Sequence, residues 1–212
     1  MKLSKYIDHT LLKQNATQKE IKKLCDEAKK YDFMSVCINP CWVNYAKKQL
    51  KGSDVKVCTV IGFPLGQNTT LIKAAEAKDA IENGADEIDM VINVSWVKEQ
   101  KAKEICTEIA LIKRVCKNKI LKVIIETCLL SDEEKVFACK CALRGDADFV
   151  KTSTGFSTGG ATIHDVELMY GAVEGKAKVK ASGGIRTKNE LLDMIKAGAS
   201  RIGTSKGCEL VK

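Results

Sequence analysis

Histidine and proline are scarce in this sequence of 212 residues, which holds only two of each. With His9 and His164 alone, there is little material for a histidine-rich catalytic metal site, and we expect no metal and no cofactor. Two prolines beside 15 glycines exclude a collagen-like or proline-rich chain. Apolar runs stay well short of the ~20 residues that a membrane-spanning helix needs, so we expect no membrane partner.

Aromatic residues are also few, at 5% of the sequence, and they are scattered along it. The formal net charge is +8, from 35 basic and 27 acidic residues. A nucleic-acid-binding surface needs clustered basic and aromatic residues, whereas lysine and glutamate alternate here along helical segments. We therefore expect no nucleic-acid partner. The excess charge indicates a lysine-rich solvated surface or, as the alternative, an anionic small-molecule ligand.

Ten cysteines are present, yet no CxxC motif occurs among them. Several lie in apolar runs, such as Cys37 and Cys58, where free cysteine behaves as a small buried hydrophobe. The first residues do not read as a secretory signal. Reduced thiols and a cytoplasmic location are the expectation, because disulfides form mainly in oxidising compartments.

Short apolar runs rich in β-branched residues alternate with amphipathic stretches along the sequence. Continuously apolar runs are typical of strands buried on both faces of a parallel sheet. Strands are predicted within residues 36–39, 55–61, 87–93, 122–127, 149–152, 178–181 and 201–203, with a weaker eighth candidate at 6–9. Helices are predicted near 17–30, 40–50, 70–83, 98–117, 132–144, 163–174 and 188–197. Capping boxes mark three helix starts, at Thr17–Glu20, Ser131–Glu134 and Thr187–Glu190.

Strands that alternate with helices indicate βαβ units and a parallel sheet. Eight such units leave ~26 residues for each, which is compact but sufficient for a TIM (β/α)8 barrel. An open doubly wound sheet is the alternative, but its nucleotide-binding motifs GxGxxG and GxxxxGK(S/T) are missing. We therefore predict one α/β domain over residues 1–212, folded as a (β/α)8 barrel.

Three ionisable residues lie inside predicted strands: Asp89, Lys151 and Lys180. In a barrel the active site lies at the carboxyl ends of the strands, and alternate residues of a strand point inward. If these three point inward, two lysines and an aspartate converge. The plainer alternative is a pair of rim lysines that extend to solvent and an aspartate in a structural ion pair.

Two neighbouring lysines in a dry site suit Schiff-base chemistry. A lysine with its ordinary pKa of ~10.4 is protonated at neutral pH, and lowering that value to 7 requires about 4–5 kcal/mol. Burial and a nearby ammonium both act in that direction. The amine then forms an iminium with an aldehyde or ketone, which accepts electrons when an adjacent C–C bond breaks. Strand alternation gives Lys151 and Lys180 equal claims to be the nucleophile.

Glycine-rich segments occupy residues 155–160, 182–186 and 203–207. The second and third follow the last two predicted strands, where phosphate sites of such barrels form from backbone N–H groups. Arg186 and Ser205 add a cation and a hydroxyl. The alternative is structural, because turns between strands and helices need glycine in any case.

The motifs together resemble the deoxyribose-phosphate aldolase family. They follow the family's order over nearly the whole chain, at Ile7–Leu12, Val36–Pro40, Thr59–Gly66, Gly84–Asn93, Lys122–Thr127, Phe149–Phe156, Val179–Arg186 and Arg201–Ser205. The resemblance implies a class I aldolase with a TIM-barrel fold. Its reaction is the reversible cleavage of 2-deoxy-D-ribose 5-phosphate to D-glyceraldehyde 3-phosphate and acetaldehyde, without metal or cofactor.

The resemblance also implies roles for particular residues. Lys151 would form the Schiff base, Lys180 would be the second active-site lysine, and Asp89 would relay protons. Substrate contacts carry over to Gly155, Gly183, Gly184, Arg186, Gly203, Ser205, Cys37 and Asp8. Members of the family are cytoplasmic and usually dimeric or tetrameric, so a homo-oligomer is expected.

Two departures from the family pattern accompany the match. Lys206 stands where many members have a second serine after Gly-Thr-Ser, and no tail ending in tyrosine follows, so we expect no proton transfer assisted by such a tail. Two other functions stay open from the residues. One is another Schiff-base barrel aldolase, or a transaldolase-like enzyme, with a different donor; the other is a non-catalytic sugar-phosphate binder.

Overall fold

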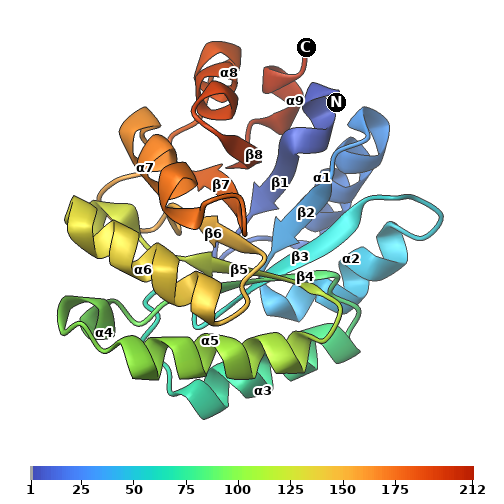
Figure 1. Cartoon of the computed structure of the whole chain (residues 1–212). Helices are drawn as coiled ribbons and strands as arrows, with labels where there is room; N and C mark the ends of the chain where they lie inside the picture. Colours follow the sequence, from blue (N-terminus) through green and yellow to red (C-terminus); the bar gives the residue numbers. More distant parts are fainter. Residues whose placement is uncertain (1) are drawn as a thin grey trace.

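The computed structural model describes residues 2–212, which form a closed barrel of eight parallel strands (Figure 1). The strands pair in sequence order, and β8 pairs with β1 to close the barrel. Their bounds are β1 Ile7–Leu11, β2 Ser35–Ile38, β3 Lys56–Ile61, β4 Glu87–Val91, β5 Ile120–Ile124, β6 Phe149–Lys151, β7 Lys178–Ser182 and β8 Ala199–Thr204. The predicted (β/α)8 barrel is confirmed.

Helices surround the barrel, and each strand is followed by at least one of them (Figure 1). The α-helices are α1 Gln18–Tyr31, α2 Val43–Gln49, α3 Thr70–Glu82, α4 Val94–Lys98, α5 Ala102–Cys116, α6 Asp132–Arg144, α7 Ile163–Val173, α8 Lys188–Lys196 and α9 Gly207–Leu210. Short 3-10 helices are η1 Leu3–Tyr6, η2 Pro40–Trp42 and η3 Thr127–Leu129. No helix within residues 2–212 combines the length and apolar character needed to cross a membrane.

The three predicted capping boxes are present. Thr17, Ser131 and Thr187 each accept a hydrogen bond from the backbone N–H of the glutamate three residues later, whose side chain bonds back. The single helix predicted over 98–117 was wrong at its start. There α4 ends at Lys98, and a left-handed φ of 56° at Gln100 prevents the helix from continuing before α5 begins.

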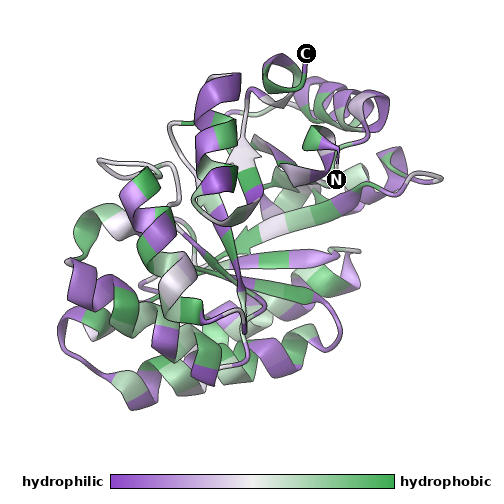
Figure 2. Ribbon diagram, turned by 45° about the horizontal axis from the view of Figure 1, so that its top comes forward, coloured by the Kyte–Doolittle hydropathy of each residue, from purple (hydrophilic) through white to green (hydrophobic). Residues whose placement is uncertain are grey.

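The two sides of the barrel wall differ in chemistry. Outward-facing strand residues such as Ile88, Leu121 and Val150 are fully buried against the helices and form the main apolar core. Figure 2 shows several strands that are mainly hydrophobic and helices that carry both kinds of residue. Inward-facing positions hold buried charged residues together with a small apolar cluster that includes Cys37 and Cys58. The interior therefore depends on charge pairing rather than on the branched aliphatic layers usual in such barrels.

Candidate active site

Asp89, Lys151 and Lys180 converge inside the barrel, from β4, β6 and β7. Strand register sets Lys151 beside Lys180 on neighbouring strands. The Nζ atoms of Lys151 and Lys180 lie 2.9 and 2.8 Å from the same atom, Oδ2 of Asp89. The convergence predicted from strand alternation is confirmed.

A third lysine, Lys122 of β5, completes the coordination of Asp89. Its Nζ donates to Asp89 Oδ1 at 2.9 Å and also pairs with Glu87. The Cys58 thiol lies 3.1 Å from the same Asp89 oxygen. Sequence reasoning missed Lys122, although the criterion that found Asp89, an ionisable residue among apolar strand neighbours, applies to it equally. Its register partner on β4 is Asp89 itself.

A second layer of charges lies around Arg201 of β8. Its guanidinium pairs with Asp8 and with Glu87, and Ser35 donates to Asp8 Oδ1 at 2.8 Å. The other Asp8 oxygen lies 2.6 Å from Lys180 Nζ. The resemblance implied that Asp8 is a polar residue of the substrate pocket. In the structure Asp8 is fully buried and contacts Lys180 and Arg201, and it does not belong to the cavity lining described within residues 2–212.

The charges of this network hold one another in their ionised states. Burial would raise the pKa of Asp89, but Lys122, Lys151 and Lys180 outweigh it and hold the value well below its ordinary range. Burial would likewise lower the pKa of Lys180, but Asp8 and then Asp89 outweigh it and raise the value. Burial and the nearby Lys122 ammonium do act to lower the pKa of Lys180, as expected, but the two carboxylates outweigh them and the net direction is upward. The two carboxylates beside Lys180 therefore favour its ammonium form.

A cavity of about 550 Å³ opens at the carboxyl ends of the strands. Lys151 belongs to its lining, whereas Lys180 is fully buried and lies outside that lining within residues 2–212. The cavity also brings together six of the predicted substrate-contact residues: Gly155, Gly183, Gly184, Arg186, Gly203 and Ser205. Besides Lys151, three cations belong to the lining, Lys13, Arg186 and Lys206, which makes the cavity suitable for an anion.

Backbone geometry explains the glycines of this lining at two places. Gly183 and Gly184 have φ values of +85° and +83°, a region in which residues with a Cβ are strained. At Gly203 a Cβ atom would lie 2.9 Å from the Ser182 Cβ and 3.2 Å from the Lys180 Cε. The glycine there permits close packing of β8 against β7, the strand that carries Lys180.

Glu126 supports the loop that follows Lys151. It lies two residues after the end of β5, has a left-handed φ of 56° and is buried. Its carboxylate accepts a hydrogen bond from the Thr154 backbone N–H at 3.1 Å and another from the Thr154 hydroxyl. Thr154 in turn accepts from the Phe156 N–H at 3.0 Å. Sequence reasoning missed Glu126, because only the fold brings it to this loop.

Cys37 lies inside the barrel rather than on the cavity wall within residues 2–212. A hydrogen bond from Cys58 lowers the pKa of Cys37 against the opposing effect of burial. Cys37, Cys58 and Asp89 form one of two groups of potential metal ligands in the described residues. Both oxygens of Asp89 already bind lysine ammonium groups, which disfavours a further cation there.

These features define a class of protein. A (β/α)8 barrel with an amine on the floor of its carboxyl-end cavity, beside an ionised aspartate and a second cation, has the parts of a Schiff-base-forming barrel enzyme. Residues 2–208 match the model of the DeoC/LacD family aldolases. The chain belongs to this family.

Relatives of the chain agree with this membership. It is 58% identical to the deoxyribose-phosphate aldolase of Lactococcus lactis subsp. lactis (strain IL1403), over all of this chain and 96% of that one. It is also 58% identical to the deoxyribose-phosphate aldolase of Finegoldia magna, with both chains fully covered. A solved tetrameric structure of deoxyribose phosphate aldolase from Aeropyrum pernix matches with a TM-score of 0.89 at 34% identity. That match covers 99% of this chain and 89% of the other.

Proposed function

We propose that this chain is a lyase that reversibly cleaves 2-deoxy-D-ribose 5-phosphate to D-glyceraldehyde 3-phosphate and acetaldehyde through a lysine Schiff base. The observation that carries the proposal is the placement of Lys151. Its amine lies between a cavity lined by glycine-rich loops and cations and a buried aspartate 2.9 Å away. Full-length relatives at 58% identity that are named deoxyribose-phosphate aldolase support the same reaction.

Lys151 is the proposed nucleophile. It belongs to the cavity lining and contacts one carboxylate, Asp89. Lys180 is fully buried and lies 2.6 and 2.8 Å from two carboxylates, which stabilise its ammonium form. A protonated amine does not attack a carbonyl. The difference in contacts therefore supports Lys151 where strand alternation alone left both lysines equal.

The cleavage follows from the chemistry of the iminium. The Lys151 amine adds to the C1 aldehyde of the open-chain sugar, and loss of water gives the iminium. A base removes the proton of the 3-hydroxyl, the C2–C3 bond breaks, and its electron pair moves into the iminium to form an enamine. Glyceraldehyde 3-phosphate leaves. Protonation of the enamine carbon and addition of water then release acetaldehyde and restore the amine.

Asp89 and Lys180 are the proposed proton carriers. Asp89 Oδ2 contacts both lysine Nζ atoms, so a proton can pass between Lys151 and Lys180 through this one oxygen. Lys122 donates a hydrogen bond to Asp89, and Asp8 forms an ion pair with Lys180. Both are therefore proposed as positioning residues for the two proton carriers. The chemistry proposed here uses no metal and no cofactor.

The phosphate of the substrate is proposed to bind in the loops after β7 and β8. Gly183 and Gly184 have positive φ angles and no side chain, so their backbone N–H groups can approach a ligand closely. Arg186 supplies a cation. The contacts proposed for Gly155, Gly203 and Ser205 belong to the same cavity lining. Cys37, which is buried inside the barrel, is proposed to lie near the bound substrate.

The chain is further proposed to act as a dimer or tetramer in the cytoplasm. A relative of known structure, from Aeropyrum pernix, is described as tetrameric, which supports self-association. All ten cysteines are free thiols, which suits a reducing compartment. Sedimentation velocity over a range of protein concentrations measures the oligomeric state directly.

Trapping with borohydride tests the proposed reaction. The protein is incubated with acetaldehyde and sodium borohydride, digested and mapped by mass spectrometry. We expect a reduced two-carbon adduct on Lys151. An adduct on Lys180 alone would overturn the assignment of the nucleophile. Folded protein without any lysine adduct would favour a sugar-phosphate binder, and trapping by dihydroxyacetone but not acetaldehyde would favour an aldolase with a different donor.

A further inference from the structure

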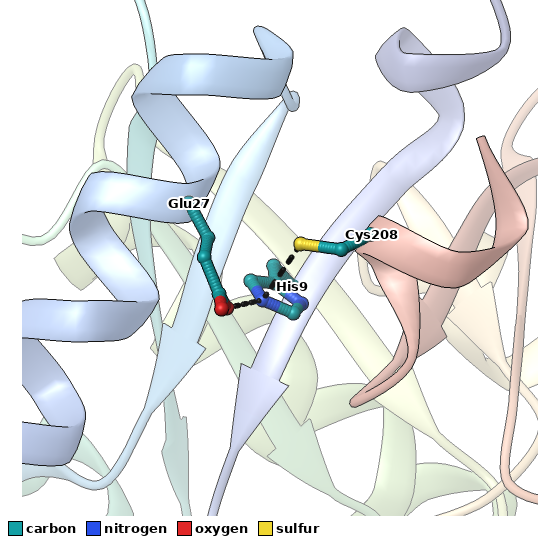
Figure 3. Close-up of side chains that lie close together, drawn as sticks. All are labelled: His9, Glu27 and Cys208. Carbon is teal, nitrogen blue, oxygen red and sulfur yellow. Dashed lines mark hydrogen bonds and ion pairs between the residues drawn. The ribbon is translucent and has the colours of Figure 1, made fainter. Parts of the chain in front are cut away.

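A second group of reactive side chains lies outside the barrel wall, on the opposite side of β1 from the catalytic interior (Figure 3). Asp8 points into the barrel, and the next residue, His9, points outward. His9 Nε2 lies 2.8 Å from Glu27 Oε2 of α1 and 4.0 Å from Cys208 Sγ of α9. Three segments far apart in the sequence thus meet at one point.

The arrangement differs from a catalytic relay. In a nucleophile–histidine–carboxylate relay the two imidazole nitrogens contact different partners. Here Glu27 and Cys208 both approach Nε2 of His9, while its Nδ1 is buried without a hydrogen-bond partner within residues 2–212. Three donor atoms of three chemical types thus lie around one point, an arrangement that suits metal coordination better than a chain of proton transfers.

We propose that His9, Glu27 and Cys208 bind a zinc ion. Imidazole, carboxylate and thiolate are the protein ligands that zinc takes. Their donor atoms all lie within 4.8 Å of one another. Around a tetrahedral zinc such atoms are ~3.3–3.6 Å apart, so the 2.8 Å contact must open and the 4.0 Å contact must close, each by about 0.5 Å.

The required movements fall on the side chains that are free to make them. His9 is only 3% exposed. Its ring packs against that of Phe33 in a tilted arrangement, with ring centroids 5.2 Å apart, which holds the imidazole in place. Glu27 is 31% exposed, and Cys208 is partly exposed on the short helix α9. Lys23 forms an ion pair with Glu27 at 3.8 Å and is 76% exposed, so zinc can displace it. A water molecule from the solvent side completes four ligands.

The proposed ion stabilises the fold and is independent of the proposed aldolase reaction. Zinc replaces the proton of the Cys208 thiol, which passes to the solvent, and joins β1, α1 and α9. α9 begins at Gly207, directly after the loop of Ser205 and Lys206 that lines the cavity. Because the folded chain alone assembles the three ligands, zinc is expected to raise the melting temperature without being needed for turnover.

Cobalt titration is the test, because Co²⁺ takes the place of zinc and its bond to a thiolate absorbs in the near ultraviolet. We expect the full chain, kept reduced with a phosphine, to develop this band with one equivalent of Co²⁺ and to lose it when zinc is added. Cys208→Ser is expected to lack the band. Cys41→Ser and Cys128→Ser, which alter exposed thiols elsewhere, are expected to keep it.

Two further measurements separate this site from adventitious binding. Zinc is expected to raise the melting temperature of the unchanged chain but not of Cys208→Ser. Glu27→Gln, a change at a partly exposed helix position, is expected to weaken cobalt binding by at least about tenfold. No thiolate band in the unchanged chain, or an undiminished band in Cys208→Ser, would overturn the proposal. Aldolase turnover retained in EDTA fits it, so failure of the zinc proposal would leave the proposed function intact.

Discussion

Charged residues occur in two contrasting regions of this protein, the barrel interior and the outer faces of the helices. The outer pairs, such as Lys22–Asp26 on α1, are about half exposed on both sides. The interior pairs, such as Lys122–Asp89 and Lys180–Asp8, are fully buried. An exposed pair interacts weakly because water and salt screen it, whereas an interior charge without its partner is strongly unfavourable. The position of a charge, and not the net excess of +8, therefore decides what it does.

The largest expected effect is the loss of turnover in Lys151→Ala. Without an amine on the cavity floor no iminium forms, and we expect the rate to fall by at least about 10⁴-fold, as for other covalent nucleophiles. The measurement is kcat for 2-deoxy-D-ribose 5-phosphate, with aldehyde release followed by a coupled assay. Lys151→Arg is the matched control, because it keeps the cation beside Asp89 and still lacks a nucleophilic amine. Appreciable activity in either variant would refute the assignment.

A stability comparison between Lys122→Met and Lys22→Met separates the two regions most directly. Both lysines pair with an aspartate, at 2.9 and 2.6 Å, but only Lys122 is buried. Lys122→Met removes one buried cation from Asp89 and from Glu87, which keep Lys151, Lys180 and Arg201 as partners, and we expect a loss of about 1–3 kcal/mol in the free energy of unfolding. Lys22→Met is expected to leave stability nearly unchanged. Urea unfolding of both variants is the measurement, and equal effects would contradict the contrast.

We expect acid to destabilise the interior network, and we expect a rise in pH to about 9 to leave its stability unchanged. The pKa values of Asp8 and Asp89 are lowered by their cationic neighbours, against burial, which would raise them. Their contribution is thus present above the unfolded value of about 3.9 and is lost as pH falls through the lower folded values. The raised pKa of Lys180 acts oppositely, with its contribution present below about 10.4 and lost above that.

The melting temperature should therefore stay nearly constant from about pH 5 to 9 and fall below about pH 4. Asp26→Asn, which removes a carboxylate of the outer region, should leave the shape of this curve unchanged. Rising stability as pH decreases from 5 to 3 would mean that the interior carboxylates are not ionised in the folded chain.

Much of the fold and part of the site are local properties of the sequence. β-branched runs and capping boxes lie within a few residues of one another, so strands and helix starts were predictable. Asp89, Lys151 and Lys180 stood out because each is polar within an apolar strand. The tie between the lysines could not be resolved from sequence, because it depends on Asp8, which reaches Lys180 only once β8 has closed the barrel between β7 and β1.

Other contacts depend on how distant segments meet. The pairing of Arg201 with Asp8 and Glu87 follows from closure of the barrel by β8 and β1. His9, Glu27 and Cys208 likewise approach one another only once α1 and α9 have packed on the outside of β1. In both cases the residue types were visible in the sequence, but the register and packing that join them were not.

Arg186 belongs between the two regions, since it is exposed and yet faces the cavity. If it contacts the substrate phosphate, Arg186→Ala removes a charge-assisted hydrogen bond of about 1.5–3 kcal/mol, which corresponds to a rise in KM of about 10–100-fold. The rise should be much smaller for unphosphorylated deoxyribose. Lys188→Ala, two residues further on and exposed, is the matched control. Equal effects on both sugars would remove Arg186 from the phosphate site.

Lys206 gives the smallest expected effect and tests where the outer region begins. It lines the cavity, but its ammonium pairs with Glu209 at 2.9 Å and both side chains are at least half exposed. Its charge is therefore screened and partly neutralised, and Lys206→Ser, which restores the serine common in the family, is expected to change KM for the phosphorylated sugar by no more than about twofold. Glu209→Gln is the companion variant, because it frees the ammonium and should lower KM if Lys206 can reach the phosphate. A tenfold rise in KM for Lys206→Ser would place this lysine with Arg186, among the charges that bind substrate rather than those that only face water.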